Sequence, residues 1–160
     1  HTQSAKAAWG EDIPYLQSVD SSADKELAAA ECTQTLTAKD LRDRLLEQYP
    51  DIKFTDLASA DSWLETKTDG TGYVTSLTVC GYDIQPNAFC DILDISSPCF
   101  VCTFANTKFT FTSYGFGHLV GMSQYGANSM AQTGSTYKEI LSHYFTGVKL
   151  QKATEQARLQ

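Results

Sequence analysis

The residues with the clearest chemical potential lie between Gly115 and Ala131, in the stretch GFGHLVGMSQYGANSMA. This stretch holds four glycines, one of the chain's three histidines and both of its methionines, and it has no Asp, Glu, Lys or Arg. Runs of this kind occur in phosphate-binding loops, in nucleophile elbows, around metal centres and on surfaces that bind a neutral ligand. The spacing of the residues separates these possibilities.

The glycine spacing argues against a phosphate-binding loop. Gly115, Gly117 and Gly121 read G-x-G-x-x-x-G, one residue longer than the dinucleotide fingerprint, and no βαβ pattern surrounds them. No Lys-Ser or Lys-Thr pair follows these glycines, as a P-loop would require. The chain has 12 basic and 19 acidic residues, a net charge of −7, so nucleic acid is not an expected partner.

A nucleophile elbow and a metal centre fit no better. The elbow G-x-S-x-G would need glycine at the position of Tyr125. His118 and His143 are far apart in the sequence, and Cys99 with Cys102 has the spacing of only half a zinc site. We therefore expect no metal and no cofactor. The cysteine count of five leaves both incidental cysteines and a disulfide open.

A surface for a neutral ligand fits the composition of the stretch. Glycine lets the backbone approach a ligand closely or adopt a positive φ. His118, Ser123, Gln124 and Tyr125 add neutral hydrogen-bonding groups and a flat ring, which together suit a sugar. The other interpretation is a tight strand-to-helix corner in which glycine serves packing only. The residues alone leave both interpretations open.

The elements expected around this stretch give an α+β fold of strands and hairpins with a few short helices. Helices are predicted where apolar residues recur at helical spacing. For the first of them, Thr37 favours the start of the helix and Pro50 ends it. The strand pattern after the turn at 69–72 places Tyr73, Thr75, Leu77 and Val79 on one face. The predicted helices cover 39–49, 85–95, 123–132 and 136–145, and a hairpin covers 99–117.

Several other side chains are candidates for the same site. Trp9 and Trp63 are possible sugar-stacking rings, although a buried core position is the prediction for both. His143 and Tyr144 would support the site from the last helix, with His143 expected to pack. Glu139 is expected to be solvated or paired rather than to act as an acid.

Three segments resemble a known family. The stretch FTFTSYGFGHLVGMSQYGANSMAQTGSTYKEILSHYFTGVKL closely resembles the C-terminal signature of the stage II sporulation protein D family. HTQSAKAAWGEDIPYLQSVDS and TKTDGTGYVTSLTVCGYDI resemble two of its upstream segments. The resemblance covers residues 1–150. It implies that this chain holds the C-terminal part of that family's domain, so that the domain is incomplete. A polar tail is expected at 151–160. The family usually has Gly where this chain has Leu119.

The resemblance implies a peptidoglycan lytic transglycosylase that acts in engulfment during sporulation. Such an enzyme cuts glycan strands between N-acetylmuramic acid and N-acetylglucosamine and leaves a 1,6-anhydro sugar, after an amidase has removed the stem peptides. It would work outside the cytoplasm, at the mother-cell membrane facing the forespore, anchored through an N-terminal region that this chain lacks. The alternative is a non-catalytic module that binds the cell wall or modifies an amidase.

The resemblance also distributes the roles. The family's catalytic glutamate lies in a run like E-A-L-K-A-Q-A-V-A-A-R-T-Y, which this chain lacks, so no catalytic residue is expected here and the chain alone is expected to be inactive. The chain is expected to bind the glycan instead. Because the domain is expected to be incomplete, the segment around Trp9, Ile13, Tyr15 and Leu16 is expected to form an apolar surface beside the loop, covered by another copy or by the missing segment. The expected binding residues are His118, Ser123, Gln124 and Tyr125, shaped by Gly115, Gly117 and Gly121.

Overall fold

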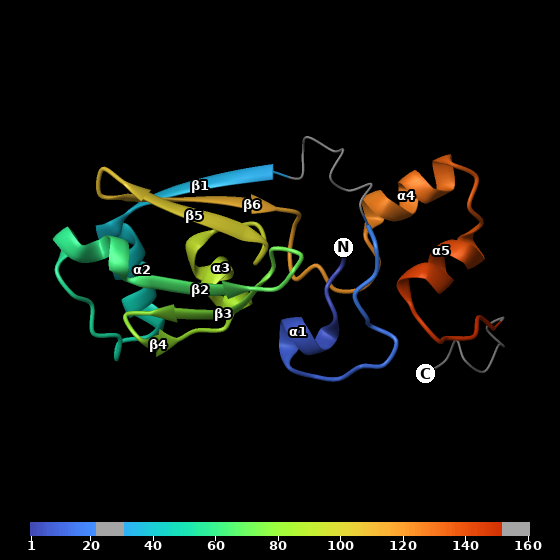
Figure 1. The fold of residues 1–160 in the computed structure, drawn as a ribbon, viewed down its shortest axis with the longest axis horizontal. Coiled ribbons are helices and arrows are strands. Elements are labelled where there is room, and N and C mark those ends of the chain that lie inside the picture. The colour runs from blue at the N-terminus through green and yellow to red at the C-terminus, as the bar shows by residue number, and fades with distance from the viewer. Residues whose placement is uncertain (22–30, 152–160) are drawn as a thin grey trace.

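The fold is α+β, as the sequence predicts, with two antiparallel sheets and short helices (Figure 1). The computed structural model describes residues 1–21 and 31–151, so nearly all of the predicted polar tail lies outside the described residues. In chain order the elements are α1 (Ala5–Trp9), β1 (Glu31–Thr37), α2 (Ala38–Gln48), the 3-10 helix η3 (Leu57–Ser62), β2 (Leu64–Thr68), β3 (Val74–Val79), β4 (Tyr82–Asp83), α3 (Pro86–Leu93), β5 (Phe100–Ala105), β6 (Lys108–Tyr114), α4 (Gln124–Gln132) and α5 (Tyr137–Tyr144).

The two sheets have the strand orders β1-β6-β5 and β2-β3-β4. The predicted hairpin is confirmed as β5 and β6, which pair antiparallel from Phe100 opposite Ser113 to Ala105 opposite Lys108. Its turn consists of Asn106 and Thr107, with φ values of 50° and 59°. Two consecutive positive φ values match the right-handed twist of the flanking strands, so this turn directs the chain straight back into β6.

The predicted face of the strand after the turn at 69–72 is only partly right. Tyr73, Leu77 and Val79 are buried, but Thr75 is exposed and Val74 is buried in its place. The register against β2 shifts here, because Lys67 pairs with Ser76 whereas Thr68 pairs with Val74. Thr75 is therefore an extra residue in β3, and a bulge of this kind reverses the alternation of side chains on one side of it.

The hydrophobic core lies between the two sheets and the helices α2 and α3 (Figure 1). Trp63 is 1% exposed, which confirms its predicted core position, and its ring lies 4.8 Å from Phe54 and 6.3 Å from Phe109. Every residue of this buried cluster lies between Leu36 and Phe111. The glycine-rich stretch therefore follows the core in sequence and is not part of it.

The four predicted helices are found, each end within two residues of its predicted place, whereas α1 and η3 were not predicted. Thr37 caps α2 by accepting a hydrogen bond from the Asp40 backbone, and Ser123 caps α4 by accepting one from Gly126. Thr136 and Glu139 form a reciprocal capping box at the start of α5. No helix within 1–21 or 31–151 is both long and apolar enough to cross a bilayer.

The N-terminal segment joins the core unit to the two last helices. Figure 1 shows it between the sheets on one side and α4 with α5 on the other. On the core side, the Gln3 amide donates to Asp69 at 3.2 Å and to the Thr71 hydroxyl at 2.9 Å. Asn87 on α3 donates to the carbonyl of Ala8 at 3.1 Å. Side-chain hydrogen bonds thus link the N-terminal segment to the turn before β3 and to α3.

The Asp69 carboxylate accepts one of these hydrogen bonds and three more from Thr71 and Tyr73 in its own turn. Burial raises the pKa of this carboxyl, but hydrogen bonds from the Thr71 side chain and backbone, from the Tyr73 backbone and from Gln3 outweigh that effect. The pKa therefore lies below its ordinary value of 3.8. The ionised Asp69 carboxylate therefore stabilises the folded state fully at pH values above its ordinary pKa of 3.8. This stabilisation is lost as the pH falls through the lower pKa of the folded state.

We expect Asp69→Asn to lower the melting temperature near neutral pH, and the difference from wild type to shrink as pH falls below about 4. Asparagine keeps one acceptor oxygen but places an NH₂ group against the amide of Gln3. Asp61→Asn, on the exposed surface of η3, controls for removal of one charge. Thermal unfolding followed across the acid range measures this. A difference that stays constant with pH would contradict the linkage.

Candidate functional site

The glycine-rich loop after β6 has an alternating backbone. Gly115, Gly117, Leu119 and Gly121 have φ values of 79°, 70°, 61° and 83°. A side chain in this left-handed region costs roughly 1–2 kcal/mol, which glycine avoids. Three of the four positions are glycine, and Leu119 bears that cost at the fourth.

Leu119 also fills the space above Gly115. A Cβ built at Gly115 would lie 2.8 Å from Leu119 Cδ2, whereas a Cβ at Gly117 would meet no atom within 4 Å. Leu119 is half-buried. The Leu119 side chain thus packs back onto the loop itself.

The His118 ring is held by the loop backbone. Its Nδ1 accepts a hydrogen bond from the Val120 N–H at 3.0 Å. A neutral imidazole that accepts at Nδ1 carries its proton on Nε2. His118 is exposed, so this Nε2–H group is a donor available at the surface.

Trp9 packs edge-on against His118, with ring centroids 5.0 Å apart and an angle of 61° between the planes. The predicted core position of Trp9 is wrong, because its side chain is 46% exposed. The physical reason is that α1 has only five residues and ends directly after Trp9, at Gly10 with φ of 79°. The ring therefore lies at the surface, beside the loop.

The apolar side chains expected beside the loop differ in their exposure. Among the residues expected there, Tyr15 is 47% exposed, whereas Ile13 and Leu16 are half-buried. Leu16 packs near Gly121, where a Cβ would lie 3.8 Å from Leu16 Cδ2. Further exposed apolar side chains on the loop and at the start of α4 are Phe116, Met122 and Tyr125.

The predicted binding residues of α4 have different roles. The Ser123 hydroxyl accepts from the Gly126 N–H at 3.1 Å and caps the helix. Gln124 and Tyr125 are exposed in the first turn, and Tyr125 is 52% exposed. Among these three, Gln124 and Tyr125 are therefore the side chains that a ligand on this surface reaches most directly.

The last helix supports the N-terminal segment rather than the loop surface. A His143 ring nitrogen, Nε2, lies 2.7 Å from the Asp20 carbonyl oxygen, and the ring packs edge-on against Tyr144. Tyr144 is 1% exposed, and its hydroxyl lies 3.1 Å from Ser21 Oγ. The packing role predicted for His143 is confirmed.

Glu139 is paired, as the sequence predicted. Its carboxylate accepts from the Thr136 N–H at 2.7 Å and from the Thr136 hydroxyl at 2.8 Å. The backbone and side-chain hydrogen bonds from Thr136 hold the pKa of this carboxyl below its ordinary value. A general acid needs the opposite shift.

The cysteines offer no reactive thiolate at this site. Burial raises the pKa of the Cys90 thiol to about 12, with a contribution from Asp91, and burial raises the pKa of the Cys102 thiol to about 12. Both thiols stay protonated at neutral pH, which disfavours metal ligation and nucleophilic chemistry. Within the described ranges, no group of three or more His, Cys, Asp or Glu side chains is placed to hold a metal ion.

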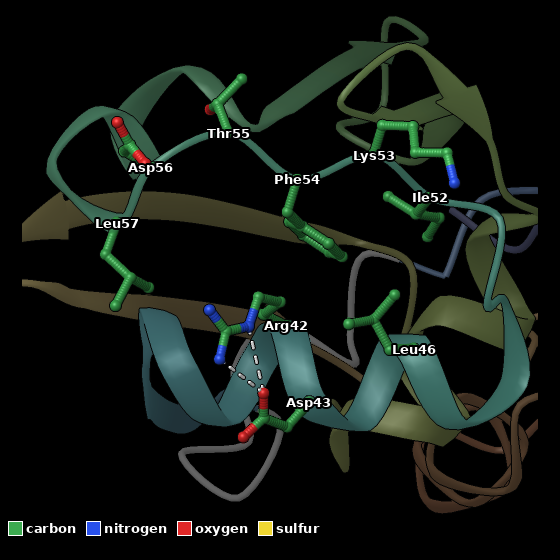
Figure 2. A pocket seen from close by; sticks show the side chains of 9 residues that line it. All are labelled: Arg42, Asp43, Leu46, Ile52, Lys53, Phe54, Thr55, Asp56 and Leu57. Carbon is green, nitrogen blue, oxygen red and sulfur yellow. Dashed lines mark hydrogen bonds and ion pairs between the residues drawn. The ribbon is translucent and has the colours of Figure 1, made fainter.

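A separate hollow of about 650 Å³ lies on the core unit, between α2 and residues 52–57 (Figure 2). In Figure 2, Leu46, Phe54 and Leu57 face its interior. The Arg42 guanidinium at its edge is already bonded to Asp43, at 3.0 and 3.1 Å. Its lining mixes both charges, and no sequence signal had pointed to it. The complete lining is Arg42, Asp43, Leu46, Ile52, Lys53, Phe54, Thr55, Asp56 and Leu57.

Comparison with curated proteins places these observations in a family context. The chain is 35% identical over 157 residues to stage II sporulation protein D of Bacillus subtilis (strain 168), and 33% identical over 155 residues to the protein of that name from Bacillus amyloliquefaciens. Both alignments cover 96% of this chain but 43% and 42% of the relatives, so the chain spans less than half of their length.

A shorter match links the chain to another protein. It is 46% identical over 44 residues to the amidase enhancer of Bacillus subtilis (strain 168), which covers 28% of this chain and 6% of that protein. No family model matches the chain.

The backbone of the loop generates a testable difference between two glycines. We expect Gly117→Ala to cost about 1–2 kcal/mol, from its positive φ alone. Gly115→Ala should cost roughly 0.5–1.5 kcal/mol more, because the new Cβ pushes Leu119 off its rotamer. Urea unfolding measures both values.

A double-mutant cycle isolates the contact with Leu119. In a Leu119→Ala background, the extra cost at Gly115 should disappear while the cost at Gly117 remains. Equal costs for the two glycines in the wild-type background would show that Leu119 does not pack on Gly115.

Proposed function

This chain belongs to the stage II sporulation protein D family, and on that basis we propose that it is the glycan-binding part of a peptidoglycan lytic transglycosylase. The substrate is a glycan strand of alternating N-acetylglucosamine and N-acetylmuramic acid. The product of the whole enzyme is a strand with a 1,6-anhydro end. The proposal places the glycan on the surface formed by Trp9, Tyr15 and the loop from Gly115 to Tyr125.

The observation that carries the proposal is the exposed Trp9 ring beside the surface Nε2–H of His118. A tryptophan ring offers an apolar face for the C–H side of a pyranose. A neutral imidazole N–H beside it donates to a hydroxyl or an acetamido carbonyl. Ligand sites commonly combine an apolar wall with a few placed polar groups, and this surface has both.

Gln124 and Tyr125 extend the same chemistry along the strand. The Gln124 amide both donates and accepts, which suits an acetamido group, and the Tyr125 ring adds a second apolar face. The charged residues Glu11 and Asp12 come after Gly10, the residue that follows Trp9 and at which the chain turns. Recognition on the loop therefore depends on neutral hydrogen bonds rather than on ion pairs.

The cleavage step requires a single carboxylic acid with a raised pKa. It protonates the glycosidic oxygen and then takes a proton from the C6 hydroxyl of the same sugar, which attacks C1 in place of water. Glu139 does not fit this role, because Thr136 lowers its pKa. We assign the acid to the family's glutamate, in a segment outside these 160 residues.

The rest of the setting follows from the same assignment. The protein would act outside the cytoplasm during engulfment, held at the mother-cell membrane by a region outside this chain. It would follow an amidase that removes stem peptides, because a bare strand fits a surface built for neutral sugars.

A second function is favoured by the match to the amidase enhancer. In that case the loop binds the cell wall without cutting it, and the protein acts by bringing an amidase to its substrate. Both functions use the same glycan surface. They differ only in whether the full-length protein supplies the catalytic acid.

Binding is tested first. In the full-length protein, His118→Ala and Gln124→Ala should each weaken binding to denuded glycan strands about 2- to 12-fold, the equivalent of one neutral hydrogen bond. Gln132→Ala, at the far end of α4, is the matched control and should bind as wild type. Calorimetric titration measures the affinities. Unchanged binding in both loop variants, at unchanged melting temperature, would return the loop to a packing role.

Catalysis is tested by mass spectrometry of digested strands. The full-length protein should release 1,6-anhydro products, and Glu139→Gln should release them at the wild-type rate because glutamine preserves the capping box. The isolated 160 residues should release none. Anhydro products from the isolated chain would place the acid within it. Wall binding without any anhydro product from the full-length protein would favour the amidase-enhancing function.

A further inference from the structure

We propose that Asp69 acts through Gln3 as a positioning residue that sets the orientation and tautomer of His118. The two side chains belong to distant parts of the chain, the turn before β3 and the N-terminal segment, and neither touches the proposed glycan surface directly. The consequence for glycan affinity rests on the proposed function, whereas the effect on the imidazole does not.

The first step is the anchoring of the Gln3 side chain. Asp69 is itself held by its own turn, where one carboxylate oxygen accepts from the Thr71 N–H, the Thr71 hydroxyl and the Tyr73 N–H at 2.8, 2.6 and 3.1 Å. Its other oxygen is left to accept from Gln3 Nε2 at 3.2 Å. Gln3 is 3% exposed, so its amide is fixed in a buried position.

The second step passes from the Gln3 side chain to its backbone. The Gln3 N–H donates to the Leu119 carbonyl at 2.7 Å, and Gln3 forms a parallel bridge with Val120. The two residues beside His118 on its C-terminal side therefore take their position from Gln3. Leu119 stays in its left-handed conformation, with φ of 61°, within this pairing.

The third step reaches the imidazole. The Val120 N–H points back to His118 Nδ1 at 3.0 Å. As long as Val120 is paired with Gln3, this N–H is aimed at the ring, and the proton of the neutral imidazole stays on Nε2. Without the pairing between Gln3 and Val120, the His118 imidazole would exchange between its two neutral tautomers. Only one of these tautomers presents an Nε2–H donor at the surface beside Trp9.

The inference also explains a buried polar side chain that the fold does not need for its core. Gln3 lies outside the buried cluster between Leu36 and Phe111. A leucine of similar size would fill the same space without polar groups. The amide, by contrast, ties the segment that pairs with the loop to the turn that contains Asp69.

The test uses the full-length protein with nitrogen-15 labelled histidine. The His118 imidazole signals, assigned by their loss in His118→Asn, should show the Nε2–H tautomer in wild type. Gln3→Leu should give signals of both tautomers and weaken binding to denuded glycan strands about 2- to 12-fold, as for loss of one hydrogen bond. Gln17→Leu is the matched control, because within residues 1–21 and 31–151 the Gln17 amide donates to the Ile13 and Pro14 carbonyls of its own turn.

Asp69→Asn is the second variant and changes no side-chain volume. It should shift His118 toward mixed tautomers in the same direction as Gln3→Leu, and it decides the question alone if Gln3→Leu does not fold. A pure Nε2–H tautomer in each folded variant would overturn the proposal, because loss of stability alone does not move the proton. If wild type binds no glycan, the proposed function fails, while the tautomer comparison still decides this inference.

Discussion

The position of the glycine-rich loop depends on one short pairing, in which the Gln3 N–H donates to the Leu119 carbonyl beside Val120. The glycine-rich loop leaves the core unit at the end of β6 and has no place in the buried cluster that stabilises the sheets. A loop with three glycines would otherwise sample many conformations, since glycine loses the most freedom on ordering. The pairing holds the loop against the N-terminal segment, and that segment is held in turn by Asp69 and Asn87.

The same segment supports the other side of the loop. Thr2 exchanges hydrogen bonds with Val19, and Asp20 and Ser21 contact His143 and Tyr144 of α5. Residues 1–21 thus touch the sheets, the loop and the last helix, although each contact is small. Polar contacts of this kind each contribute modestly, about 0.5–1.5 kcal/mol, so the arrangement depends on their number rather than on any single one. This is a suitable design for a binding surface whose backbone must be open but ordered.

The surface that results is apolar, aromatic and neutral. Trp9, Tyr15, Phe116, Met122 and Tyr125 are all 40% exposed or more. Exposed apolar patches on soluble proteins often mark binding sites. Here Phe116, Met122 and Tyr125 lie within the family signature and Trp9 packs on His118, which is why we propose this surface, and not the hollow beside α2, for the glycan. The lining of that hollow carries both charges, and its Arg42 and Asp43 are paired with each other.

Local patterns in the sequence determined the elements. Thr37, Ser123 and Thr136 begin helices because their side chains cap the backbone, and Asn106-Thr107 turns a hairpin because two positive φ values match strand twist. The family signature from Phe109 to Leu150 was likewise readable without coordinates. These signals are local, and each is complete within a few residues.

Only the tertiary structure decided which side chains meet. Trp9 was expected in the core, yet it lies on the surface against His118, because α1 ends directly after it. The bulge at Thr75 comes from pairing with β2 and is invisible in the alternation of β3 alone. Asp69, Gln3 and His118 lie far apart in sequence, and no spacing rule joins them. Their association depends on backbone pairing between distant segments, which sequence periodicity does not encode.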